Sequence, residues 1–190
     1  MTQMQLGAAQ RPAVGETVCG DAYVMVERGA RKLIAVVDGS GHGPLAAEAA
    51  HLFRDFVSLH AAEPLELLFL GAHAALADTR GAAASILRVD ESSGALEFAG
   101  IGNVHVVAQS ASAIHPAPQP GILGRRFRHA KVLPFSVARG DTLVMFSDGI
   151  SSRVQLAPYL HLDPDAMARA ILAEHGASHD DATCVALRFA

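Results

Sequence analysis

The chain is poor in cysteine and lysine and has no tryptophan. Its 190 residues include only Cys19 and Cys184, which form neither a disulfide framework nor a CxxC pair. This usage is typical of a reducing compartment, and we expect both thiols to be small core residues. Neither cysteine has a histidine neighbour in the sequence or follows a helix-start signal, which argues against an activated thiolate.

Long apolar runs are also missing. None approaches the roughly 18–20 residues that span a bilayer, and the start, MTQMQLGAAQRP, lacks the charged and apolar regions of a secretory signal. The net charge of −4, with an isoelectric point near 6.2, argues against a nucleic-acid binder. We therefore expect a cytoplasmic protein with no membrane or nucleic-acid partner.

Hydrophobic residues make up 51% of the sequence, so the chain can build a core without disulfides. Length and the absence of repeats predict one domain covering residues 1–190, and the apolar composition without a long loop favours a monomer. The proline-rich stretch from His115 to Gly121 is too short to separate domains and is expected to be a surface loop.

Short apolar runs bounded by turn residues predict strands, and longer runs at helical spacing predict three helices. The expected helices cover 45–60, 65–78 and 163–175, the last with Asp163 as N-cap and Gly176 as C-cap. The expected strands cover 22–27, 32–37, 83–90, 95–100, 104–109, 131–137, 141–147 and 183–189. Tight turns between neighbouring strands indicate mainly antiparallel sheets, and hence an α+β fold.

Familiar nucleophile and phosphate motifs are missing. The sequence contains no G-x-S-x-G elbow and no GxxxxGK[ST] loop. The glycine-rich segment from Gly39 to Gly43 follows a predicted strand and precedes a predicted helix, so it could cradle a phosphate. It lacks the spacing of a dinucleotide-binding fingerprint.

Aspartates at the ends of strand-like runs are stronger candidates for functional residues than these motifs. They occur in Gly20-Asp21, Asp38-Gly39, Asp148-Gly149 and Asp180-Asp181. A carboxylate at the end of a buried strand is costly unless it is paired or binds a metal, and oxygen ligands favour Mg²⁺ or Mn²⁺ over zinc. A single Asp-Gly is usually only a turn, so spacing alone leaves both a di-metal site and simple turns open.

An ordered set of motifs carries a family resemblance over nearly the whole chain. GDAYVM, VVDGSGHGPLAAEAA, FSDGI and DDATCVAL resemble, in order and position, the motifs of the metal-dependent protein phosphatases (PPM, type-2C-like). DGSGHG followed by AAEAA is similar to the bacterial SpoIIE-type branch. LADTRGAAASILRVD and PGILGRRFR are similar to the small RsbX-like phosphatases of stressosome signalling modules.

The resemblance implies an αββα sandwich of two mainly antiparallel sheets flanked by helices, with a di-metal site at one edge. It implies two Mn²⁺ or Mg²⁺ ions, with Asp38 bridging them and Gly39 binding through its carbonyl oxygen. Asp181 would lie beside the site without touching metal. The side chains implied as ligands are Asp21, Asp38, Asp148 and Asp180.

The implied activity is hydrolysis of phosphoserine or phosphothreonine, with water as the nucleophile. Implied substrates are phosphorylated STAS-domain signalling proteins, whose dephosphorylation would reset a stress or sigma-factor response. GETVCGD has no arginine before Asp21 to bind the phosphate, so the candidates are Arg80, Arg125, Arg126 and Arg128. His42 is a candidate proton donor to the leaving group, with a packing role as the alternative.

Two other functions stay open. The chain could be a catalytically weak binding module that docks STAS-domain proteins, although four costly carboxylate sites argue against this. It could also be a metal-dependent hydrolase of small phosphoesters. No aromatic-rich pocket supports that function, because the chain has no tryptophan and only Tyr23 and Tyr159.

Overall fold

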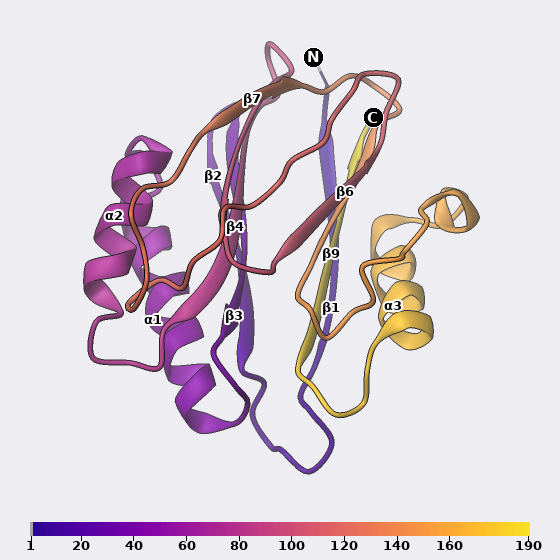
Figure 1. Cartoon of the computed structure of the whole chain (residues 1–190). Helices are drawn as coiled ribbons and strands as arrows, with labels where there is room; N and C mark the ends of the chain where they lie inside the picture. The colour runs from indigo at the N-terminus through magenta and orange to yellow at the C-terminus, as the bar shows by residue number, and fades with distance from the viewer. Residues whose placement is uncertain (1) are drawn as a thin grey trace.

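Two antiparallel sheets pack face to face, and helices cover both outer faces (Figure 1). The computed structural model describes residues 2–190. The helices are α1 (Pro44–His60), α2 (Leu65–Ala75) and α3 (Pro164–His175), with a 3₁₀ turn at Ala157–Tyr159. The strands are β1 (Met4–Arg11), β2 (Asp21–Arg28), β3 (Arg31–Gly39), β4 (Ala82–Asp90), β5 (Ala95–Ile101), β6 (His105–Gln109), β7 (Leu133–Ser136), β8 (Thr142–Phe146) and β9 (Ala182–Phe189).

One sheet has the strand order β1-β9-β8-β6 and the other β2-β3-β4-β5-β7. Helices α1 and α2 cover the outer face of the five-stranded sheet, and α3 covers the four-stranded sheet (Figure 1). Between the sheets lies a core that includes Ile34, Leu87 and Val185, all fully buried. The αββα sandwich expected from the resemblance is therefore confirmed.

Local hydrogen bonds explain two of the helix boundaries. The Asp163 side chain accepts a hydrogen bond from the amide of Ala166 at 2.8 Å, which caps α3 as predicted. Helix α2 ends at Ala75 instead of residue 78. The chain turns there because the Thr79 hydroxyl donates to the Leu76 carbonyl at 2.8 Å.

Strand β1 was not predicted. Its sequence, MQLGAAQR, is built from glutamine, glycine and alanine, which have little intrinsic strand preference. The strand forms because it pairs along its whole length with β9. Gly7 also lets α3 approach closely, since a Cβ there would lie 2.1 Å from the Asp165 amide nitrogen.

Two tight turns join strands in different sheets. The turn at Gly102-Asn103 connects β5 of the five-stranded sheet to β6 of the other, and the segment before β8 crosses in the same way. The proline-rich segment stays bound to the first turn, because Gly102 N–H donates to the Gln119 carbonyl at 2.8 Å. It is a loop fastened to the sandwich, as expected.

The prediction for the cysteines is half right. Cys184 is fully buried in β9, whereas Cys19 is only partly buried and donates its thiol hydrogen to the Arg11 carbonyl. Burial raises the pKa of both thiols to about 12, so both stay protonated at neutral pH. Across residues 2–190, no helix combines the length and hydropathy needed to cross a membrane.

Candidate metal centre

The predicted aspartates gather at one end of the sandwich. Antiparallel pairing of β2 with β3 sets Asp21 directly opposite Asp38. Asp148 follows the end of β8, and Asp180 and Asp181 precede the start of β9, which pairs with β8. These strand ends lie at the end of the molecule away from the two termini (Figure 1).

Asp21 is the most deeply buried of the ligand candidates, with 2% of its surface exposed. The Ser147 hydroxyl donates to Asp21 Oδ2 at 2.6 Å, and the Ser147 oxygen accepts from the Thr183 amide at 3.0 Å. Burial raises the pKa of Asp21 to about 7, although the Ser147 hydrogen bond opposes this. The negative charge of Asp181 raises that pKa further.

Asp38, Asp148 and Asp180 line an open pocket with a volume of about 570 Å³. Burial, followed by the charges of Asp21 and Asp148, raises the pKa of Asp38 well above its ordinary value. Burial and the charge of Asp148 likewise raise the pKa of Asp180. The Asn103 side-chain amide donates to Asp148 Oδ2 and fixes this carboxylate in the pocket.

Asp181 is buried next to the four ligand candidates. Its Oδ1 accepts from the Ala13 amide at 2.9 Å, and it packs against Gly20, where a Cβ would lie 2.5 Å from Oδ2. Within residues 2–190, that Oδ2 is buried and has no hydrogen-bond partner. A buried carboxylate oxygen without a donor, next to mutually repelling aspartates, fits a nearby cation.

The aspartate side chains are close together but do not form a complete set of metal ligands around one point. Within the part of the chain that the structure describes, no three His, Cys, Asp or Glu residues are arranged around one point as metal ligands. The donor set nevertheless suits a hard divalent cation, because it consists of carboxylate oxygens.

Two glycines allow the segments that carry the aspartates to pack closely against neighbouring backbone. A Cβ on Gly39 would lie 2.0 Å from the Ala46 carbonyl oxygen in α1, so only glycine fits between Asp38 and the helix. A Cβ on Gly149 would lie 1.9 Å from the Asp181 carbonyl oxygen. These close approaches explain why each strand-end aspartate is followed by glycine at these two positions.

His42 is held away from the pocket. Its Nδ1 lies 2.6 Å from Glu16 Oε1, and its side chain is 61% exposed. The Glu16 carboxylate also packs on Gly43, the residue that precedes α1. His42 is not among the residues that line the pocket. Its contact with Glu16 links the loop before α1 to the loop before β2.

The candidate arginines have different environments. Arg80 does not line the pocket itself but lies beside the loop that does, because a Cβ on the pocket-lining Gly41 would lie 3.0 Å from its Nη1. The Arg125 guanidinium donates to the Thr79 carbonyl oxygen, which makes it a structural contact. The Arg126 carbonyl accepts from Ile122 in the pocket wall, and the side chains of Arg126 and Arg128 are exposed.

Sequence reasoning missed three residues of this site: Ser147, Asn103 and Glu16. Ser147 stands directly before Asp148, and Asn103 lies in a segment interpreted only as a turn. Glu16 lies in the loop before β2. Their partners Asp21, Asp148 and His42 are distant in the sequence, so no local signal marks these contacts.

The comparisons with known proteins agree with this fold. Residues 28–190 match the family model of stage II sporulation protein E (SpoIIE). The phosphoserine phosphatase RsbX of Bacillus subtilis (strain 168) is 29% identical over 139 residues, which are 72% of this chain and 70% of RsbX.

Solved structures show the same likeness. A structure from work on the bacterial stressosome, as a modular system adapted to control secondary messenger signaling, is 34% identical. It has a TM-score of 0.94 over 98% of this chain and 100% of that one. RsbX in complex with magnesium has a TM-score of 0.88 at 24% identity, over the full length of both chains. The chain therefore belongs to the SpoIIE family, and its fold is that of the PP2C-type phosphatases.

Proposed function

We propose that this chain, as one domain of residues 1–190, is a divalent-metal-dependent phosphatase that hydrolyses phosphoserine or phosphothreonine in a signalling protein. The observation that carries the proposal is the convergence of Asp21, Asp38, Asp148 and Asp180 at one end of the sandwich, beside an open pocket. Family membership and the RsbX relative support the same activity.

Two Mn²⁺ or Mg²⁺ ions would be held by these four carboxylates, with Asp38 between them and the Gly39 carbonyl as a further ligand. When bound, the metals supply Lewis-acid activation of water and neutralise charge on the phosphoryl oxygens. RsbX has been solved with magnesium, which supports the choice of ion. Asp181 would shape the site electrostatically while its Oδ1 holds the Ala13 amide.

Other side chains position this machinery. Ser147 orients Asp21, and Asn103 orients Asp148, each through a hydrogen bond to one carboxylate oxygen. Arg80, beside Gly41 of the pocket-lining loop, would bind the substrate phosphate. His42 would hold the loop through Glu16, which makes it a positioning residue.

A protein substrate is favoured by the comparisons. The curated relative is a phosphoserine phosphatase, and the structural neighbour comes from a stressosome. We therefore propose phosphorylated STAS-domain proteins as substrates, with removal of phosphate resetting the signal. A binding module of the same fold, or a small-phosphoester hydrolase, would retain the fold but not this substrate preference.

The test is phosphate release from a phosphorylated STAS-domain protein, measured with Mn²⁺ and with chelator. We expect metal-dependent release that falls roughly a hundredfold or more in Asp38→Asn, because the variant removes a charge from the centre of the ligand set. The matched control is Asp55→Asn, which changes an aspartate on α1 whose side chain is 62% exposed.

Undiminished release from Asp38→Asn would contradict the assigned ligands. A folded native chain that binds the STAS-domain protein but releases no phosphate with any metal would favour the binding module. Faster turnover of nucleotides than of the phosphoprotein would favour the small-phosphoester hydrolase.

A further inference from the structure

We infer that a cationic rim beside the pocket, made of Arg126, Arg128 and Lys131, selects phosphoproteins that carry acidic residues next to the phosphorylated side chain. The inference rests on the proposed phosphatase function and adds a substrate class to it. The three rim side chains are exposed.

Backbone contacts attach the rim to the pocket wall. Ile122 N–H donates to the Arg126 carbonyl at 2.8 Å, and the Lys131 amide donates to the Gln119 side chain at 2.5 Å. Ile122 and the two prolines on either side of Gln119 line the pocket. The rim therefore belongs to the segment that forms the wall facing the aspartates.

This segment is held firmly. Leu123 and Ala82 exchange backbone hydrogen bonds of 2.8 and 3.1 Å, which join it to the start of β4. A Cβ on Gly81 would lie 2.8 Å from Ile122 Cγ2, so the segment packs tightly against the chain beside Arg80. The rim cations are thus presented from a fixed backbone, which lowers the entropy lost when a substrate binds.

The rim cations have no internal counter-charges. Among residues 2–190, the ion pairs within 4.0 Å join other groups, such as Arg31 with Asp90, Lys32 with Glu91 and Arg88 with Glu97. None of the ion pairs found in this part of the chain includes a rim residue.

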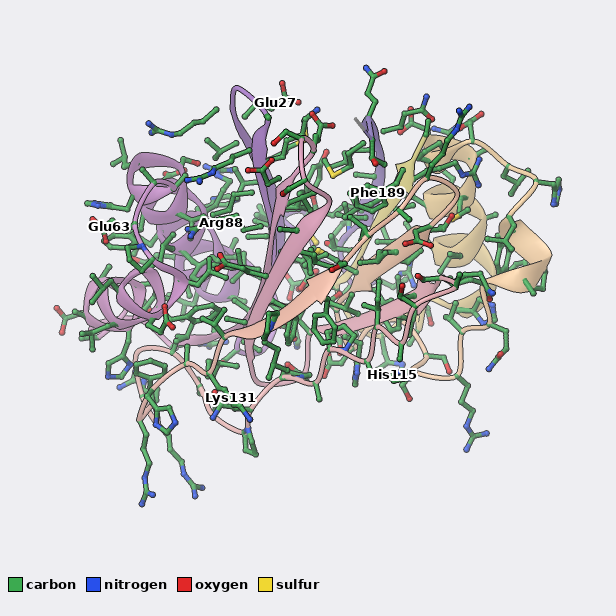
Figure 2. All side chains as sticks on the ribbon, turned by 90° about the horizontal axis from the view of Figure 1, so that it is seen from above. Glu27, Glu63, Arg88, His115, Lys131 and Phe189 are labelled. Carbon is green, nitrogen blue, oxygen red and sulfur yellow. The ribbon has the colours of Figure 1, made fainter. Side chains whose placement is uncertain are left out.

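Figure 2 places Lys131 on the side of the molecule opposite Glu27 in that view, away from the paired charges of the β2–β3 hairpin. These exposed cations lie within six consecutive residues of a chain whose net charge is −4. Unpaired surface cations attract anions at distances up to a Debye length, about 8 Å at physiological salt.

The apolar residues of the pocket wall restrict which substrates fit the site. Ile122 is 40% exposed, and together with Pro118 and Pro120 it gives the pocket an apolar wall next to the segment that carries the rim. An extended peptide with its phosphate at the aspartates would cross this apolar wall before reaching the cations. The matching substrate has a phosphorylated residue, an apolar neighbour and then acidic residues.

The test uses two phosphoserine peptides of equal length, with three glutamates or three glutamines beyond an apolar residue next to the phosphoserine. We expect the native chain to prefer the acidic peptide by about threefold to tenfold in kcat/KM at low salt. The preference should shrink as salt is added, because exposed charges are screened. Arg128→Glu with Lys131→Glu should abolish it.

The matched control is Arg139→Glu with Arg169→Glu, which makes the same charge change at exposed positions elsewhere. Hydrolysis of p-nitrophenyl phosphate reports the reaction itself and should be equal in both double variants. Equal turnover of the two peptides by an active native chain would overturn the rim but not the phosphatase. No turnover of any substrate would overturn the phosphatase.

A nucleic-acid role for the rim is a further outcome. If a single-stranded oligonucleotide inhibits the native chain but not the rim variant, while the peptides are hydrolysed equally, the patch binds nucleic acid and the inferred substrate class is wrong. Loss of peptide preference in the control variant would also overturn it, because net charge alone would then explain the effect.

Discussion

Arg80 is the residue that we propose binds the substrate phosphate. Arg80 Nη1 lies against Gly41, a residue of the loop that lines the pocket, whereas Arg125 is engaged by the Thr79 carbonyl. We expect Arg80→Gln to lower kcat/KM by about tenfold to a hundredfold for both p-nitrophenyl phosphate and a phosphopeptide. Most of the effect should appear in KM, with partial rescue in Arg80→Lys.

Arg169→Gln serves as the control for this variant, because Arg169 is exposed on α3, which covers the other sheet. If Arg80→Gln affects only the phosphopeptide, Arg80 belongs to protein docking and not to phosphate binding. That result would leave the phosphate-binding residue unassigned while keeping the carboxylate site.

At the same scale, the sequence identifies residues whose chemistry is unusual for their position. An aspartate that ends a buried apolar run is such a residue, and for this reason Asp38 and Asp148 could be predicted. Ser147 and Asn103 are ordinary residues where they stand. Their roles come from contacts with Asp21 and Asp148 that exist only in the folded chain.

At the scale of elements, the turn that follows β8 packs directly against the segment that precedes β9. The Gly149 Cα faces the Asp181 carbonyl, and an added Cβ would lie 1.9 Å from that oxygen. We expect Gly149→Ala to lower the free energy of unfolding by about 1–3 kcal/mol, because backbone must move to make room. The melting temperature should fall by about 2–10 °C, and Mn²⁺ affinity should fall with it.

Ser152→Ala is a suitable comparison, since Ser152 is exposed in the same loop. Unfolding should be followed in chelator and again in Mn²⁺, so that packing and metal binding are separated. An unchanged melting temperature in chelator would show that the turn adjusts without cost and that the stacking does not fix Asp181.

Elements with strong local signals could be predicted, and those set by their partners could not. The β2–β3 hairpin and α3 have clear turn and capping residues, and both form as expected. Strand β1 has no such signal and depends on β9 and on the close approach of α3 at Gly7. A short turn also cannot reveal that β5 and β6 lie in different sheets.

For the whole molecule, the sandwich concentrates negative charge at one end. Strands from both sheets bring Asp21, Asp38, Asp148 and Asp180 together, although the total charge is only −4. Burial is the main cause of the raised pKa of Asp21, Asp38 and Asp180. The folded chain without metal therefore holds protons that the unfolded chain releases near pH 4.

This difference gives a pH dependence with a definite sign. The raised pKa of Asp21, about 7, means that its contribution to stability is complete below about pH 4 and is lost as pH rises through 7. We expect the unfolding free energy in chelator, measured by urea denaturation, to be lower at pH 8 than at pH 5 by about 3 kcal/mol or more, because Asp21 alone contributes about 1.4 kcal/mol per pH unit between pH 5 and 7. Asp21→Asn should reduce the difference, because it removes one of the titrating groups.

Added Mg²⁺ or Mn²⁺ should act in the opposite sense. Metal binds the ionised carboxylates, so the stabilisation that it gives should increase from pH 5 to pH 8, by the linkage between metal and proton binding. Asp55→Asn, an exposed change on α1, should leave both trends intact. Stability in chelator that instead rises between pH 5 and pH 8 would mean that the aspartates are ionised in the folded chain without metal. Burial would then be a smaller influence on this site than the packing of Asp21 indicates.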